Sequence, residues 1–437
     1  MPSRFSRRRF LQTSAAAAAG LYGVPLRAQE KKVGANDKLH VGVIGVAGQG
    51  EYNWRQLAGV ASAEVVALCD VDESRKDKGV QKARDHFAKA AFFTDFRKLI
   101  DSKGLDAVLV ATPDHNHAVA TVAALKSGRH VFCEKPLTHD VCEARVVAET
   151  AAKHKRVTQM GTQIHAGDNY RRVVELVQSG AIGAVREVHV WCAKSWGGGD
   201  RPKQTPAVPP GLNWDLWLGP ALERPYHPTY VPFNWRRWWA FGGGTLADMA
   251  CHHVDLPFWA LKLRHPTRVS IEGDPTPAHA ETAAKTLVVT YEFPARGELP
   301  PVKLTWYDGG KRPALFTEKK LPTWGDGTLF VGEKGMLLAD YDHRRLLPEK
   351  DFAGFVAPKP FIPNSIGHHR EWVEACKNGG TTTCPFDYAG ALTETVLLGN
   401  VAYRLGKPIT WDAAKLKANE PEAEKFLRKE YRKGWSL

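Results

Sequence analysis

Between residues 38 and 162, short apolar runs alternate with stretches whose residues suit helices. Short runs that are apolar throughout are typical of parallel strands, because helices cover both faces of a parallel sheet and bury every side chain. The apolar runs are residues 41–44, 65–69, 107–111, 130–133 and 156–160. This alternation predicts an α/β domain with a parallel sheet and right-handed crossover connections.

The alternation stops after residue 165. Strand-like runs then follow at residues 185–193, 268–272, 285–293, 302–307 and 327–341. They suit an α+β domain with an open, mostly antiparallel sheet. A chain of 437 residues is long enough for two cores, so we expect domains at residues 38–162 and 163–437.

The end of the chain predicts helices. Residues 368–378 and 387–405 have helical patterns, and Gly406, Lys407 and Pro408 stop the second one. Residues 413–434 are rich in arginine, lysine and glutamate, which predicts a surface helix exposed to solvent.

The first 28 residues have the order of a signal peptide. A basic segment, Ser6-Arg7-Arg8-Arg9-Phe10-Leu11, precedes an alanine run, and the stretch closes on a small residue, Ala28. The paired arginines before Phe-Leu match the twin-arginine pattern, whose machinery exports folded proteins. We therefore expect a periplasmic or otherwise exported protein. The apolar part is too short for a membrane span and no later segment reaches that length, so no span is expected.

The overall composition, 43% hydrophobic and 24% charged, is typical of a globular protein. Five arginines and no acid precede residue 29, so removal of the signal peptide lowers the net charge from +13 to +8. The other basic residues are interspersed with acids and form no dense stripe, which excludes nucleic acid as an expected partner. The seven cysteines form no CxxC pair and no close group with histidine, so no metal site is expected.

A glycine-rich loop, Gly45-Val46-Ala47-Gly48-Gln49-Gly50, follows the first apolar run and opens a helix. Asp70 ends the second apolar run, 20 residues beyond Gly50. This arrangement predicts a Rossmann dinucleotide site, in which Gly45 permits the turn, Gly50 allows close packing and the helix N-terminus faces the pyrophosphate. The Asp70 carboxylate would bind the adenosine ribose and repel a 2′-phosphate, which favours NAD. Arg75 and Lys76 could accommodate that phosphate, so NADP stays an alternative.

Three motifs in order resemble the glucose–fructose oxidoreductase/inositol dehydrogenase (Gfo/Idh/MocA) family. After the glycine loop, residues 111–117 contain Ala-Thr-Pro-Asp-His-Asn-His, and residues 134–136 are Glu-Lys-Pro. Residues 248–255 contain Asp-Met-Ala-Cys-His-His-Val-Asp, with Ala250 where the family usually has glycine. The resemblance covers most of residues 38–260 and implies an NAD(P)-dependent oxidoreductase that acts on a sugar, polyol or glycoside hydroxyl.

Hydride transfer from a carbinol requires a base for the hydroxyl proton and positive charge for the developing alkoxide. The resemblance implies that Lys135 and His252 handle the proton and that Asp248 contacts the substrate hydroxyls. On one continuous helix, Asp248, His252 and Asp255 would share a face, so Asp255 joins the predicted substrate site. These three residues could alternatively hold a metal ion. His253 points about 100° away from His252 and is interpreted as structural.

Further cofactor residues follow from the same motifs. The resemblance places Glu134 and the Thr112-Pro113 loop near the nicotinamide, with Lys135 beside them. His117 is included in this cofactor site, where we interpret it as structural support for the loop.

A loop-rich insert, residues 195–239, contains much glycine, proline and tryptophan. It resembles the exported subgroup of the family found in bacteria that degrade polysaccharides. The functional hypothesis is a sugar platform in which Trp235 or Trp238 stacks on the ring and Asn234 and Arg236 bind hydroxyls. The alternative is that these aromatic residues brace long loops.

Export raises a question about the cofactor, because the periplasm is not expected to hold a circulating nicotinamide pool. We therefore expect a tightly bound dinucleotide that is loaded before export and regenerated in place. One alternative is a glycosidase that works by transient oxidation, elimination and addition of water. Another is a carbohydrate-binding protein without catalysis. The open sheet commonly pairs subunits in this family, so a homo-oligomer is expected.

Overall fold

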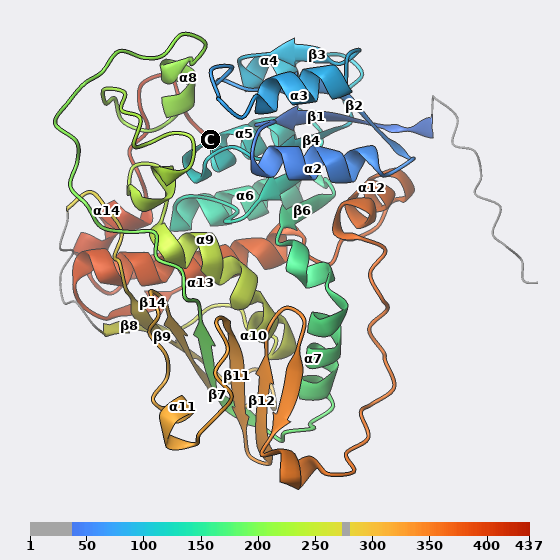
Figure 1. The fold of residues 1–437 in the computed structure, drawn as a ribbon, viewed down its shortest axis with the longest axis vertical. Coiled ribbons are helices and arrows are strands. Elements are labelled where there is room, and N and C mark those ends of the chain that lie inside the picture. The colour runs from blue at the N-terminus through green and yellow to red at the C-terminus, as the bar shows by residue number, and fades with distance from the viewer. Residues whose placement is uncertain (1–36, 273–279) are drawn as a thin grey trace, which may run out of the picture. The chain divides into compact units, whose positions relative to one another are not determined.

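A computed structural model describes residues 37–272 and 280–437 of this chain. The predicted signal peptide lies outside the described residues. Residues Leu39–Leu437 form one compact unit that contains two sheets (Figure 1).

The first sheet has six parallel strands in the order β3-β2-β1-β4-β5-β6. The strands are β1 (Leu39–Ile44), β2 (Ala63–Cys69), β3 (Ala91–Phe93), β4 (Ala107–Val110), β5 (His130–Glu134) and β6 (Thr158–Gly161). The order reverses between β1 and β4, and ligands of such sheets bind at the carboxyl ends of the strands at this switch point. The predicted Rossmann fold is confirmed; β3 is a short edge strand that the apolar pattern does not reveal.

Helices cover both faces of this sheet (Figure 1). They are α2 (Gln49–Ala58), α3 (Gly79–His86), α4 (Phe96–Ile100), α5 (His117–Lys126) and α6 (Val141–His154). All four residues of β4 are buried, which explains why its sequence is apolar throughout.

The second sheet has nine strands in the order β13-β12-β11-β7-β10-β9-β8-β14-β15. All neighbours are antiparallel except β7 and β10. The strands are β7 (Val185–Trp191), β8 (Arg268–Glu272), β9 (Val288–Phe293), β10 (Val302–Tyr307), β11 (Gly327–Gly332), β12 (Gly335–Ala339), β13 (Arg344–Leu347), β14 (Ile409–Asp412) and β15 (Lys417–Ala418). The predicted α+β domain with a mostly antiparallel sheet is therefore confirmed, and the run 327–341 forms a hairpin.

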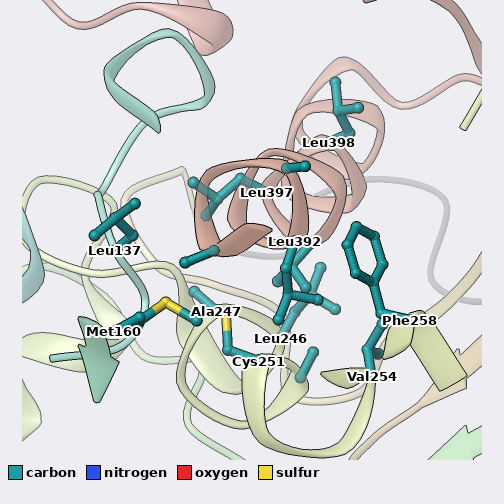
Figure 2. Close-up of a cluster of buried hydrophobic side chains, with 14 of the residues drawn as sticks. Leu137, Met160, Leu246, Ala247, Cys251, Val254, Phe258, Leu392, Leu397 and Leu398 are labelled. Carbon is teal, nitrogen blue, oxygen red and sulfur yellow. The ribbon is translucent and has the colours of Figure 1, made fainter. Parts of the chain in front are cut away.

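Helix α13 (Phe386–Leu405) joins the two halves, because it packs against α6 on one side and α9 (Gly244–His253) on the other. Figure 2 shows Leu392, Leu397 and Leu398 of α13 among side chains of α9 and the following α10 (Asp255–Ala260). Leu137 and Met160, from the region of the first sheet, lie in the same cluster. This core fixes the position of α9 relative to the first sheet.

Other helices follow the first sheet in the chain. They are α7 (Asp168–Gln178), α8 (Trp214–Leu218), α11 (Leu315–Glu318) and α12 (His368–Asn378).

The surface helix predicted over residues 413–434 is wrong. The segment contains β15 and only a four-residue helix, α14 (Glu424–Leu427). Leu416 takes a left-handed conformation with φ of 52°, which interrupts a helix, and β14 and β15 extend the second sheet at its edge. The pairing of β14 with β15 and the burial of Leu427 therefore decide the structure of this segment, and its charged composition does not make it a surface helix.

Within the described residues, no helix is long and apolar enough to cross a membrane. All seven cysteines are free, and Cys376 is the one that is not fully buried.

Candidate active site

The glycine loop turns sharply between β1 and α2. Gly45 has φ of 81°, and a Cβ atom there would lie 2.6 Å from the carbonyl oxygen of Ala111. A Cβ atom at Gly50 would lie 1.9 Å from the carbonyl oxygen of Gly45. Both positions therefore need glycine, and the loop brings the N-terminus of α2 to the carboxyl ends of the strands.

Asp70 lies beside this loop at the end of β2. Its carboxylate accepts hydrogen bonds from the backbone N–H of Val46 at 2.9 Å and of Asp72 at 3.0 Å. Burial raises the pKa of Asp70. The Arg75 guanidinium, which the NADP alternative would use, donates to Asp77 at 2.5 Å instead.

A cavity of about 320 Å³ follows the carboxyl ends of β1, β2 and β4. Most of the predicted cofactor residues line it: Gly45, Ala47, Gly48, Gln49, Asp70, Thr112 and Pro113. Gly50 does not line the cavity and serves the packing of α2 instead. We call this space the cofactor cavity.

A second cavity, of about 460 Å³, lies between the first sheet and α9. Its lining includes the predicted residues His117, Glu134, Lys135, Asp248 and His252. We call this space the substrate cavity. The two cavities share six lining residues and therefore adjoin: Gln49, Ala111, Thr112, Phe233, Trp235 and Arg236.

An ion-pair network lies in the substrate cavity and reaches this junction through Arg236. The Lys135 Nζ atom donates to the Asp248 carboxylate and to the Asp248 backbone oxygen, both at 2.8 Å. Arg236 Nε donates to the same carboxylate oxygen at 3.1 Å. The side chains of Lys135 and Asp248 are only 12% and 11% exposed, so little solvent screens the pair.

Both pKa values in the pair follow from these contacts. Burial by itself lowers the pKa of Lys135, but the Asp248 charge outweighs burial and raises it above its ordinary value. Burial by itself raises the pKa of Asp248, but the charges of Lys135 and Arg236 hold it well below its ordinary value. The Lys135 ammonium and the Asp248 carboxylate therefore stabilise each other's charged forms, and the ammonium suits a developing alkoxide.

His252 lines the substrate cavity, and its Nδ1 atom has no protein partner. Burial and the charge of Lys135 lower the pKa of His252 well below its ordinary value. Asp248 lies one helical turn before His252, but its carboxylate binds Lys135 and Arg236. His253 does not line either cavity; it stacks on Tyr341 in the core.

The placement of Asp255 in the substrate site is wrong. Helix α9 ends at His253 and α10 begins at Asp255, so the three residues do not continue along one helix. Asp255 is fully buried, lies 2.9 Å from His165 Nδ1 and accepts from the Tyr388 hydroxyl at 2.6 Å. The alternative metal site formed by Asp248, His252 and Asp255 fails for the same reason.

Glu134 is held by three side-chain amides. Asn53 and Gln163 each donate to its Oε1 atom at 2.8 Å, and Gln49 donates at 3.2 Å. Burial raises the pKa of Glu134. His117 connects the cofactor loop to the lysine motif, because its ring nitrogens lie 2.7 Å from the Pro136 oxygen and 2.8 Å from the Thr112 oxygen.

The insert contributes part of the predicted platform. Trp235 lines both cavities, and the Arg236 guanidinium lies 4.3 Å from the centre of its ring. Phe233, which the sequence did not single out, also lines both cavities and lies 4.4 Å from the same guanidinium. Asn234 is exposed and lines neither cavity, so its predicted role is wrong. Trp238 is buried inside the insert and lines neither cavity, so of the two stacking candidates only Trp235 reaches a cavity, and Trp238 fits the bracing alternative. The short 3-10 turn directs neighbouring side chains to different sides.

The insert also covers the cofactor cavity. The Glu73 backbone N–H donates to the Gly211 oxygen at 2.9 Å, and that of Asn213 donates to the Val71 oxygen at 2.8 Å. These bonds join the insert to the loop after β2, beside Asp70. Leu216 and Trp217 of α8 then form part of the cavity wall.

The end of the chain holds α8 in place, and Figure 1 shows the C-terminus beside it. Arg432 pairs with the Asp215 carboxylate and donates to the backbone oxygens of Asp215 at 2.9 Å and Gly219 at 3.1 Å. Trp435 packs near Phe96, another residue of the cavity wall, with ring centres 6.0 Å apart. These contacts join segments far apart in the sequence, so no local pattern reveals them.

Several further residues line the substrate cavity that sequence reasoning missed: Asp114, Lys194, Trp196, Asp326 and Tyr341. Asp114 lies inside the motif at residues 111–117, which is the signal that could have identified it. Burial raises the pKa of Asp114 to about 8. The other residues come from separate segments of the second half and carry no motif.

The structure thus combines a parallel dinucleotide-type sheet with a mixed sheet, and Lys135 lies where the two halves meet. The model of the Gfo/Idh/MocA oxidoreductase family with an NAD-binding Rossmann fold matches residues 39–162. The model of the C-terminal alpha/beta domain of the same family matches residues 167–298. The chain belongs to the Gfo/Idh/MocA oxidoreductase family.

Curated relatives match part of the chain. Inositol 2-dehydrogenase 1 of Saccharopolyspora erythraea is 36% identical over 153 residues, which are 35% of this chain and 44% of that protein. A glycosyl hydrolase family 109 protein of Shewanella pealeana is 27% identical over 201 residues, 41% of this chain and 44% of that protein. The chain thus spans less than half the length of these relatives.

Among solved structures, GenD2 from gentamicin A biosynthesis in complex with NAD has a TM-score of 0.60 at 20% identity. The match covers 90% of this chain and 100% of that one. At this identity the likeness shows the fold, and it extends to both halves of the described chain.

Proposed function

We propose that this protein oxidises a hydroxyl group of a sugar, polyol or glycoside with a tightly held NAD that is recycled in place. The observation that carries the proposal is the Lys135–Asp248–Arg236 network, which lines the substrate cavity and reaches the cofactor cavity through Arg236. A polyol or sugar substrate is supported by the similarity to an inositol 2-dehydrogenase.

The residues of the cofactor cavity suit a dinucleotide. The glycine loop leaves no room for a Cβ atom at Gly45 or Gly50, α2 points its N-terminus at the cavity, and Asp70 lies at the end of β2. Bound NAD would accept a hydride from the substrate carbinol. Asp70 would hold the ribose, and the 112–113 loop would lie at the nicotinamide end.

The residues of the substrate cavity perform the remaining steps. His252 accepts the hydroxyl proton, and the positive charge of Lys135 stabilises the alkoxide that this forms. The carbonyl then forms as the hydride leaves the carbon. Asp248 orients Lys135 through its 2.8 Å hydrogen bond. Phe233 and Trp235 offer apolar ring faces on which a sugar ring could stack.

The proposed retention of the cofactor is supported by the insert and the C-terminal segment, which cover the cofactor cavity. The test is to purify the protein without added dinucleotide, denature it and identify the released nucleotide by mass spectrometry. Stoichiometric NAD or NADP supports the proposal and identifies the cofactor to follow in a sugar screen. A protein that is empty and also binds neither dinucleotide would overturn it.

A second candidate is a glycosidase that oxidises its substrate transiently, eliminates the glycosidic group and adds water. It is favoured by the similarity to the family 109 glycosyl hydrolase of Shewanella pealeana. Turnover of a glycoside in heavy water separates the candidates: exchange at the carbon next to the oxidised centre, with release of the leaving group, indicates the glycosidase. Binding of ligand with no turnover of any kind would instead support the carbohydrate-binding alternative.

We further propose that the folded, loaded protein is exported by the twin-arginine route and assembles as a homo-oligomer. The order of the first 28 residues supports export, and seven free cysteines suit folding before export. Light scattering of the purified protein measures the assembly, and a monomer at working concentration would contradict that part.

A further inference from the structure

A buried group of potential metal ligands lies outside the network described above. Cys192, His253 and Asp326 each offer one potential ligand atom, and these three atoms lie within 4.8 Å of one another. Cys192 and His253 are 1% and 2% exposed. Within the described residues, no other histidine, cysteine and carboxylate group meets this condition.

The fold places these three residues together. Cys192 follows the last residue of β7, and Asp326 precedes the first residue of β11. Those two strands pair with Trp191 opposite Gly327, so Cys192 and Asp326 are the next neighbours along the pair. The Ala193 backbone N–H donates to Asp326 Oδ1 at 2.7 Å and fixes that carboxylate. His253 is the last residue of α9.

A second observation points to a ligand. The His253 ring is anchored by stacking on Tyr341, whose hydroxyl lies 3.1 Å from Nε2. The other ring nitrogen, Nδ1, is buried without any hydrogen-bond partner. A buried imidazole nitrogen with no partner is costly unless something else binds it.

We propose that Cys192, His253 and Asp326 bind a divalent metal ion, with zinc the best match, at the edge of the substrate cavity. One thiolate, one imidazole and one carboxylate are ligands that zinc accepts, and soft sulfur disfavours magnesium and calcium. Ligand atoms around tetrahedral zinc are about 3.5 Å apart, so the three atoms, which lie within 4.8 Å of one another, need at most a small contraction to bind the ion.

Three protein ligands leave one position open. Asp326 and Tyr341 also line the substrate cavity, so water or a substrate hydroxyl can take that position. Binding forms one bond each to sulfur, nitrogen and oxygen, and the thiol proton leaves to solvent. The Cys192 thiolate and the Asp326 carboxylate together balance the two positive charges of the ion. The Lys194 Nζ atom donates to Met249 Sδ at 3.5 Å.

The test is metal binding to the full protein after treatment with a chelator. Zinc is titrated against a chromophoric indicator, and cobalt(II) is added to a second sample for absorption spectroscopy. We expect one equivalent of tightly bound zinc and a cobalt spectrum with a thiolate charge-transfer band.

Three variants sharpen the test. Cys192→Ser and Asp326→Asn are expected to weaken zinc binding at least 100-fold, and the asparagine can still accept from Ala193. Cys384→Ser, at an equally buried cysteine elsewhere, is the matched control and keeps full binding.

Zinc binding to the parent that is no tighter than to Asp326→Asn, or a cobalt spectrum without a thiolate band, overturns the proposal and indicates an adventitious ion only. If Cys192→Ser does not fold, the cobalt spectrum of the parent still tests whether a thiolate binds the metal.

Discussion

At the scale of single residues, two contacts with Asp248 set the position of the Lys135 ammonium group and raise its pKa. The lysine follows the last residue of β5, and the aspartate lies in the middle of α9, so their pairing depends on how the two halves pack. The motifs identified both residues, but nothing local indicated that Asp248 would bind Lys135 and Arg236 rather than His252.

Lys135→Met should lower kcat by about 10²–10⁴-fold, because the alkoxide loses its cation and proton transfer loses a partner. NAD content should stay at the parent level, because the glycine loop and the insert are unchanged. Steady-state kinetics and nucleotide analysis by mass spectrometry measure the two quantities. Lys126→Met, at an exposed lysine on α5, is the control and should behave as the parent. Full activity in Lys135→Met would contradict the assigned role.

Asp114→Asn should change how stability depends on pH. Burial raises the pKa of Asp114 in the folded protein to about 8, above the value of about 4 in an unfolded chain. The parent therefore loses stability as pH rises from about 4 to about 8, whereas the asparagine variant has no such loss.

The free energy of unfolding of the variant should therefore rise relative to that of the parent, by up to about 1.4 kcal/mol for each pH unit between about pH 4 and about pH 8. Above about pH 8 the difference between the two proteins should stay constant. Denaturant unfolding at several pH values measures this difference. A difference that is the same at pH 5 and pH 8 would refute the assignment.

At the scale of elements, the glycine loop and the insert illustrate two kinds of information. The loop is local: Gly45 and Gly50 are required by contacts with neighbouring backbone, so a short motif identifies it. The insert over residues 195–239 was expected to form a sugar platform or to brace loops, and it also closes the cofactor cavity. Its bonds to Val71 and Glu73 cross more than a hundred positions of sequence.

Arg432→Ala should release the cofactor faster, because Arg432 holds α8 and the following Gly219, and α8 forms part of the cavity wall. Loss of hydrogen bonds from one charged group predicts a rate increase of about tenfold. Dialysis followed by nucleotide quantification measures the loss.

The matched control is Arg428→Ala, since Arg428 pairs with Glu424 on its own short helix at an exposed position. Equal retention of NAD by both variants would show that the C-terminal segment does not hold the cofactor cavity closed.

At the scale of the whole molecule, the two sheets meet through α13, whose residues are nearly all buried between α6 and α9. This helix fixes the distance between β5, which carries the lysine motif, and α9. Export of such a protein in the folded state would keep the cofactor enclosed during translocation.

Replacing Arg7 and Arg8 together with lysine should prevent export, because the twin-arginine machinery requires the arginine pair. Cell fractionation and immunoblotting should find the variant in the cytoplasm and the parent in the periplasm. Arg27→Lys, which keeps the same charge near the cleavage region, is the control and should be exported. Export of the double variant at the parent level would exclude this route.

The sequence by itself determined the Rossmann sheet, the glycine loop and the family motifs, because each depends on neighbours within a few residues or on a repeated strand–helix pattern. It also identified Lys135, Asp248, His252, Trp235 and Arg236, all of which line the substrate cavity. Only the tertiary structure decided that Asp255 turns into the core, that Phe233 joins the platform and that Cys192, His253 and Asp326 meet. Those placements depend on where α9 ends and how strands pair across the second sheet, and packing between distant segments sets both.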